Sequence, residues 1–170
     1  MARLSLSTVL RPTAPATGSP GLPRWAVPAS LGLALAGLGV SIYLTVEHFT
    51  APGSAACLLG AEGSCARVTT SAQSKFLGIP VAVLGTVFFV ALVALCLPRL
   101  WASRDVRVWR ARLAAAGLGM VFVLYLIFAE IFLVEAICMW CTVVHLITFA
   151  LFSVIVLATA LADPSPFDRP

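Results

Sequence analysis

Long apolar segments dominate the hydrophobic pattern of this chain, and short stretches between them hold nearly all of its charged residues. A helix needs about 20 apolar residues to cross a bilayer. The segments that meet this requirement cover residues 25–46, 76–97, 113–135 and 137–162. Backbone groups in lipid must pair internally, which only helices and closed barrels achieve. The pattern therefore predicts an all-α integral membrane protein built as a four-transmembrane-helix bundle.

Composition supports a membrane location for most of the chain. Of its 170 residues, 61% are hydrophobic and only 11% are charged, too few charges to cover a soluble domain of this size. Residues 1–24 differ, because they contain four prolines and three arginines and no long apolar run. They are predicted to form a disordered cytosolic tail, not a signal peptide. Residues 163–170 are predicted to form a second short cytosolic tail, which leaves 25–162 as the membrane domain.

The basic residues lie mainly on one side of the predicted bundle. With four crossings, nine of them share the side of both termini, whereas only Arg67 and Lys75 lie on the other side. Because positive residues are retained in the cytoplasm, the protein is predicted to lie in the inner (cytoplasmic) membrane with both termini cytoplasmic. The net charge of +4 then reflects topology and contact with anionic lipid, not nucleic-acid binding. The nine are Arg3, Arg11 and Arg24 in the N-terminal tail, Arg99, Arg104, Arg107, Arg110 and Arg112 in the loop after the second helix, and Arg169 in the C-terminal tail.

Four of the five cysteines are predicted to lie outside the cytoplasm, where disulfides persist. Cys57 and Cys65 belong to the loop between the first and second helices, and Cys138 and Cys141 lie at the start of the fourth. Positions three apart share one face of a helix, so the sulfurs of the second pair are expected to point into one cavity. The helix N-terminus should also lower the pKa of Cys138.

Several kinds of chemistry fit these cysteines. Three pairings are possible, and sequence distance favours Cys57 with Cys65 and Cys138 with Cys141. Purely structural disulfides are one interpretation, but a Cys-x-x-Cys bridge closes too short a loop to constrain much of the chain, so redox exchange is favoured. Zinc is a weaker alternative because Cys57 and Cys65 are spaced too widely for typical ligands, and no metal is predicted. Cys96, at the cytosolic end of the second helix, is predicted to be a small buried hydrophobe.

Two titratable side chains fall inside predicted helices. An ionisable group within a crossing helix is costly and is a functional candidate by default. His145 lies one helical turn from Cys141 on nearly the same face, so a functional role is favoured over a neutral histidine bonded to a neighbouring helix. For Glu130 a structural role is favoured, with proton handling as the alternative. Glu135 is expected to be wet at the interface.

Five segments carry a more specific pattern. In chain order they are SIYLTVEHF, the loop cysteine pair in CLLGAEGSC, CARVTTS, FLGIPVAVLG and YLIFAEIFLVEAICMWC. A single Cys-x-x-Cys motif would be weak evidence for any family. A loop cysteine pair, a serine, Gly-Ile-Pro and a membrane Cys-x-x-Cys in this order form a specific signature. Over roughly residues 30–160 the chain resembles the vitamin K epoxide reductase family, in particular its bacterial members. The resemblance implies a four-helix bundle around a quinone, with an extracytoplasmic loop that carries a short helical cap.

The resemblance also implies a role for each cysteine of the two pairs. Cys57 would meet the partner protein, and Cys65 would relay electrons to Cys138. Cys141, one turn deeper, would face the quinone, either menaquinone or ubiquinone. Ser71 would lie on the helical segment that caps the site.

Two positions depart from the animal members of the family. His145 stands where those enzymes have a tyrosine that contacts the quinone oxygen, and it is expected to donate a hydrogen bond there. Ser74 falls near the position of a quinone-binding asparagine. Both residues are therefore candidates for quinone binding, and both departures argue against epoxide chemistry.

The expected function is that of a membrane thiol-disulfide oxidoreductase. It would reoxidise a separate extracytoplasmic thioredoxin-fold protein of the DsbA type and pass the electrons to a membrane quinone, supporting disulfide bond formation. One alternative is a quinone or vitamin K epoxide reductase that uses the same cysteines in reverse. The other alternative is a non-enzymatic membrane scaffold stapled by disulfides.

Overall fold

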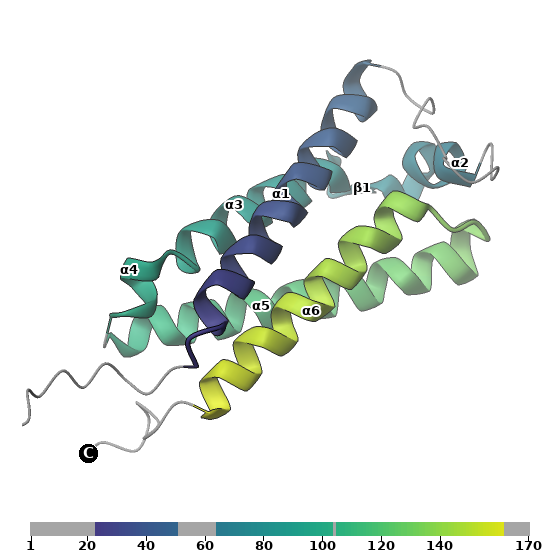
Figure 1. The fold of residues 1–170 in the computed structure, drawn as a ribbon. Coiled ribbons are helices and arrows are strands. Elements are labelled where there is room, and N and C mark those ends of the chain that lie inside the picture. The colour runs from purple at the N-terminus through teal and green to yellow at the C-terminus, as the bar shows by residue number, and fades with distance from the viewer. Residues whose placement is uncertain (1–22, 51–63, 104, 162–170) are drawn as a thin grey trace, which may run out of the picture.

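The computed structural model describes residues 23–50, 64–103 and 105–161 and shows a helical bundle (Figure 1). Its four main helices lie side by side, and short elements lie at its two ends. The main helices are α1 (Ala26–Thr50), α3 (Val81–Leu95), α5 (Val106–Phe128) and α6 (Met139–Leu161). One end carries α2 (Ser64–Thr70), the 3-10 turn η2 (Ala72–Ser74) and two short strands, and the opposite end carries α4 (Pro98–Trp101). Nearly all of the predicted tails, 1–24 and 163–170, lies outside the described residues.

Three helices of the described chain are long and apolar enough to cross a membrane. They are α1, α6, and α5 together with its π-helical continuation η3 (Ala129–Val134). α3 has only 15 residues, and at 1.5 Å per residue it is about 22 Å long, less than the hydrocarbon thickness. The chain therefore has the architecture of a largely helical, multi-pass membrane protein, and the count of four crossings stays a prediction.

Small side chains bring α1 close to α3 and α6. The buried residues of α1 recur every three or four positions and are Ala26, Ser30, Ala34, Gly37, Ser41 and Leu44. Small residues let helix backbones approach closely in membrane proteins, where lipid removes the usual hydrophobic drive. At Gly37 there is no room for a Cβ atom, because the ring of Phe89 from α3 occupies that position. This contact fixes the distance between α1 and α3.

The helix predicted over residues 76–97 begins later than expected. Its first residues form a hairpin in which β1 (Lys75–Phe76) pairs antiparallel with β2 (Ile79–Pro80). The turn places Leu77 at φ 53° and Gly78 at φ 83°, outside the helical region. Pro80 lacks a backbone N–H and disfavours helical geometry in the residue before it. The helix therefore starts at Val81, so its predicted start at residue 76 is wrong. The described chain is still mostly helical and compatible with the predicted all-α class, and the two-residue strands are a local exception.

The arginine-rich loop is also shorter than predicted. α5 begins at Val106, so Arg107, Arg110 and Arg112 lie in a helix and not in a loop. The Asp105 side chain caps this helix by accepting a hydrogen bond from the backbone N–H of Arg107 at 2.8 Å. The expected start of this helix after Arg112 is wrong, because the cap and six helical residues lie before that arginine.

Arg112 is buried at the α4 end of the bundle, where it joins α3, α4 and α5. Its Nε and Nη2 atoms donate to the carbonyl oxygen of Leu95 at 3.0 and 2.8 Å. Its guanidinium carbon lies 3.8 Å from the centre of the Trp101 ring, a cation–π contact that is strong away from water. Cys96 is fully buried in the adjacent hydrophobic core, which confirms its prediction as a small buried hydrophobe.

Candidate active site

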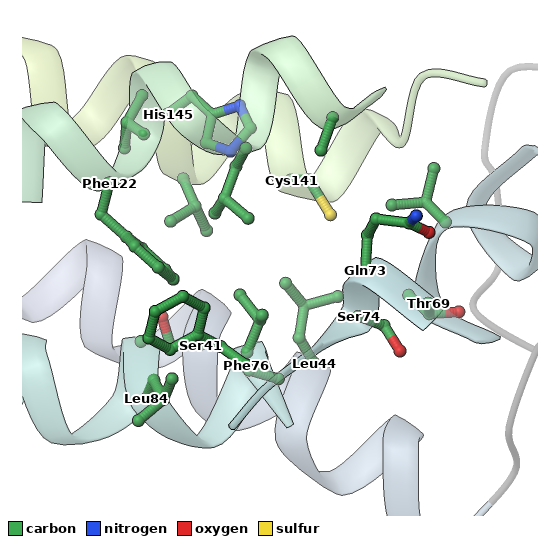
Figure 2. Close-up of a pocket in the computed structure, with 18 of the residues that line it drawn as sticks. Ser41, Leu44, Thr69, Gln73, Ser74, Phe76, Leu84, Phe122, Cys141 and His145 are labelled. Atoms are coloured by element: carbon green, nitrogen blue, oxygen red, sulfur yellow. The ribbon is translucent and has the colours of Figure 1, made fainter. Parts of the chain in front are cut away.

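A cavity of about 530 Å³ lies between the four main helices at the end of the bundle that carries α2. Most of its lining is apolar, and its polar side chains are few. Figure 2 shows the Cys141 sulfur and the His145 ring pointing from α6 into this space, opposite Leu44 and Phe76. Apolar lining comes mainly from Leu44, Val81, Leu84, Phe88, Phe89, Phe122, Val123, Leu126 and Val144. The cavity has the size and character of a small-molecule site.

The two cysteines of the Cys-x-x-Cys motif occupy different positions at this cavity. Cys141 is in the first turn of α6, half-buried, and lines the cavity. Cys138 precedes the helix, is fully buried, and packs against Val68 and Trp140 outside the cavity lining. The expectation that both sulfurs point into one cavity is therefore wrong, because α6 begins only at Met139. Both thiols are free, and no disulfide joins them.

The start of α6 stabilises negative charge on Cys138. The backbone N–H of Cys141 donates to the Cys138 sulfur at 3.4 Å. The pKa of Cys138 is lowered from 9.0 to about 7, mainly by a hydrogen bond from the Cys141 thiol, and also by the backbone N–H groups of Cys141 and Trp140. Burial opposes this effect but does not cancel it. The predicted lowering of the Cys138 pKa is confirmed in direction, and it favours the thiolate form that attacks and leaves disulfides.

α2 covers Cys138 and is tied to the neighbouring hairpin. Its Val68 packs on Cys138, and the Nη2 atom of Arg67 donates to the carbonyl oxygen of Val134 at 3.1 Å. Cys65 lies in α2 three residues before Val68, so the backbone of α2 brings this one cysteine of the loop pair to the Cys138 side of the site. Cys57 lies outside the described residues, and its role stays a prediction.

Ser71 and Ser74 both line the cavity, beneath α2. The Ser71 hydroxyl donates to the carbonyl oxygen of Val68 at 2.8 Å, and the Ser74 hydroxyl donates to that of Ser71 at 2.7 Å. These bonds hold the cap in a compact turn and leave the oxygen lone pairs as acceptors. Gln73, between the two serines on η2, also lines the cavity (Figure 2). The sequence reasoning missed Gln73, although its place between two predicted site residues was an available signal.

Two ionisable side chains of the membrane helices belong to the site. His145 is 6% exposed and Glu130 is 7% exposed, and both line the cavity. Glu130 also forms a side-chain hydrogen bond with Cys141. Glu135 is exposed, as predicted. Among the described residues, no cluster of three His, Cys, Asp or Glu side chains is placed to hold a metal ion.

The Cys138 thiol should titrate with a midpoint near pH 7 in the reduced full-length protein, well below the ordinary value of 9.0. Thiolate absorbance in the ultraviolet, followed across neutral pH, measures this midpoint. A Cys141→Ala variant removes the hydrogen bond that contributes most, so its midpoint should move up toward 9.0. In a Cys138→Ser variant, the rise in thiolate absorbance that belongs to Cys138 should disappear, which identifies it. A midpoint near 9.0 in the unmodified protein would contradict a lowered pKa for Cys138.

A family comparison covers the whole of this site. The model of the vitamin K epoxide reductase family matches residues 28–156. This range includes α1 from its third residue on, the hairpin, the Cys-x-x-Cys motif and every residue that lines the cavity.

Proposed function

Because this chain belongs to the vitamin K epoxide reductase family, a family of membrane oxidoreductases, we propose that it is a quinone-dependent thiol-disulfide oxidoreductase. It would reoxidise an extracytoplasmic thioredoxin-fold protein of the DsbA type and pass the electrons to a membrane quinone. The observation that carries this proposal is the free Cys141 thiol, which faces an apolar cavity while its partner Cys138 lies outside the cavity under α2.

The cavity residues fit a quinone. A quinone head group is a flat ring with two carbonyl oxygens, and its tail is apolar. The aromatic and aliphatic lining suits the ring and tail, and His145, Gln73 and the two serines supply polar groups at separate places in the lining. We assign His145 as a hydrogen-bond donor to one quinone oxygen. When bound, the quinone supplies the acceptor for two electrons and two protons.

In the proposed exchange, electrons move from Cys57 and Cys65 to Cys138 and Cys141, and from there toward the cavity. Two thiols of the partner reduce the Cys57–Cys65 disulfide, and the partner leaves with its own disulfide. Cys65 then attacks Cys138, the Cys138–Cys141 bond breaks, and Cys57 closes on Cys65 to release Cys138 as a thiolate. Cys138 and Cys141 rejoin as a disulfide when they release two electrons toward the cavity.

The low pKa of Cys138 supports this order of events. A thiolate of lowered pKa is a good leaving group in disulfide exchange, so Cys138 is released readily when Cys57 attacks Cys65. The position of α2 supports it too, because α2 carries Cys65 and packs on Cys138 through Val68. Cys141 makes contact with the cavity instead, which suits the thiol that works nearest to the acceptor.

We further propose that the α2 end of the bundle is extracytoplasmic and that both termini are cytoplasmic in the inner membrane. The distribution of arginines supports this orientation, since Arg99, Arg107 and Arg110 lie at the α4 end, opposite α2 (Figure 1). Both cysteine pairs would then share the oxidising compartment.

Trapping tests the proposed function. A Cys65→Ala variant leaves Cys57 without its internal partner, so it should hold the thioredoxin-fold partner through a mixed disulfide that survives in non-reducing gels. The adduct should be absent from a Cys57→Ala, Cys65→Ala double variant, which serves as the matched control. A disulfide-stapled scaffold predicts no adduct in either variant, and that result would contradict the proposal.

A further inference from the structure

Glu130 is a carboxyl group buried inside an apolar helix and beside a reactive thiol. It is 7% exposed, lines the cavity and hydrogen-bonds with the Cys141 side chain. A carboxylate at such a depth is costly unless it has a partner or a task. Its partner in the described structure is the Cys141 thiol.

A local irregularity of the helix fixes the position of Glu130. It lies in the π-helical segment η3, and its carbonyl oxygen accepts hydrogen bonds from the backbone N–H groups of Glu135 and Ala136. Glu135 ends the segment in the left-handed conformation at φ 53°. A π-helical turn changes the direction in which a side chain leaves the helix, and such turns occur often at functional sites. Here the turn accompanies the contact of Glu130 with Cys141 across the α5–α6 hairpin.

The Cys141 thiol has one proton and two acceptors. It hydrogen-bonds with the sulfur of Cys138 and with the carboxylate of Glu130. While Cys138 is a thiolate, the two acceptors compete for this proton. Once Cys138 is bonded to another sulfur, it is a poor acceptor, and the carboxylate remains.

We propose that Glu130 is the catalytic acid–base group of Cys141, taking the thiol proton when the sulfur must be a thiolate and returning it when the sulfur must be a thiol. In this transfer the S–H bond of Cys141 breaks and an O–H bond forms on Glu130, with no movement of electrons between redox partners. When Cys138, as a thiolate, and Cys141 join in a disulfide, the two electrons that they lose go to the membrane quinone. The Cys141 proton passes through the Glu130 carboxyl to one quinone oxygen, and the second proton, which Cys138 lost earlier, is taken up from solvent. This inference rests on the proposed function for its place in the cycle.

Other charged or titratable groups surround Glu130, and each could contribute to the pH dependence of the site. α6 contributes His145, and the connection before it contributes Cys138. α2 contributes Arg67, which is bound to the carbonyl of Val134 in the same segment. α1 contributes His48, which lines the cavity. Glu130 still has to be tested by itself, because, of the carboxyl, histidine and arginine side chains around the site, it is the one that hydrogen-bonds with the Cys141 side chain in the described structure.

Alkylation of Cys141 tests the shared proton without any redox partner. The full chain is prepared with Cys57, Cys65, Cys96 and Cys138 replaced by alanine, and Cys141 is alkylated with iodoacetamide as a function of pH. A carboxylate beside the thiol opposes a second negative charge, so Glu130→Gln should move the alkylation profile about one pH unit lower. Glu135→Gln, an exposed carboxyl five residues away, is the matched control and should leave the profile unchanged.

Turnover tests the catalytic part of the proposal. With dithiothreitol as donor and a short-chain ubiquinone analogue as acceptor, Glu130→Gln should lower kcat by about 10²-fold or more, with little change in KM. Glu130→Asp should recover part of this loss because it keeps the acid–base group. The glutamine variant would thus hold more thiolate and yet turn over more slowly, a combination that a structural role does not produce.

The outcomes separate the two proposals. An alkylation profile that Glu130→Gln does not change overturns the acid–base role, and so does a glutamine variant with the kcat of the unmodified protein. If the unmodified protein reduces no quinone, the proposed function fails. The alkylation profile then still decides whether Glu130 and Cys141 share a proton.

Discussion

A Cys141→Ala variant is expected to lose dithiol-dependent quinone reduction by about 10³-fold or more, because loss of the reacting group of a catalytic unit removes most of its rate. Cys141 is the cysteine of the Cys-x-x-Cys motif that lines the cavity. Without its sulfur, Cys138 has no partner for an intramolecular disulfide, so two electrons cannot leave the pair together. Initial rates with dithiothreitol and a ubiquinone analogue measure the loss.

Cys96→Ala is the control for this experiment. Cys96 is also buried and free, but it lies at the α4 end of the bundle, away from the cavity. Its replacement should leave the rate within about twofold of the unmodified protein, since Cys96 lies outside the cavity lining and takes no part in the proposed exchange. Comparable losses in both variants would mean that the effect comes from packing and not from thiol chemistry, and the assignment of Cys141 would then be wrong.

Gly37→Ala should destabilise the bundle by about 2 kcal/mol, within the range found when a methyl group is forced into a packed core. A Cβ atom at this position meets the Phe89 ring, and Phe89 is itself 1% exposed, so the ring has no free space to enter. Because Phe89 also lines the cavity, its displacement should weaken quinone binding as well. Thermal or denaturant-induced unfolding of the protein in mild detergent measures the change in the free energy of unfolding.

Gly39→Ala gives the opposite expectation on the same helix. Nothing lies within 4 Å of a Cβ at Gly39. Alanine is the better helix former there, by up to about 1 kcal/mol, so this variant should be at least as stable as the unmodified protein. Equal destabilisation by both substitutions would show that the contact of α1 with Phe89 does not limit the approach of the helices.

Some residues of the candidate site could be identified from sequence motifs, whereas others could be identified only from the geometry of the folded chain. The Cys-x-x-Cys spacing and the apolar sequence around it were sufficient to identify Cys138, Cys141 and His145 as candidates. The contact between Glu130 and Cys141 was not predictable, because it depends on a π-helical turn and on the left-handed Glu135 that ends it. Residue spacing on a regular helix gives no signal for either feature.

The hydrophobic pattern was enough to predict the membrane character of the chain and most of its long helices. The segments expected at 25–46 and 137–162 correspond to α1 (Ala26–Thr50) and α6 (Met139–Leu161). These assignments hold because lipid leaves a long apolar segment few alternatives to a helix. The family resemblance, carried by motifs in their order, is likewise confirmed by the match over residues 28–156.

The starts of the helices and the set of side chains that share the cavity became clear from the packing of the folded chain. Phe76 and Ile79 look like helix residues in an apolar run, but they pair in a hairpin because Gly78 and Pro80 favour a turn there. Arg112 looks like a loop residue, but it is buried in the fold. Its guanidinium is stabilised there by a hydrogen bond to the Leu95 carbonyl and a cation–π contact with the Trp101 ring. Packing also decides the positions of the two active-site thiols. Cys138 lies under α2, whereas Cys141 faces the cavity. The hydrophobic pattern indicates whether lipid or water surrounds a segment. The helix starts and the positions of the site residues depend instead on contacts between residues far apart in the chain.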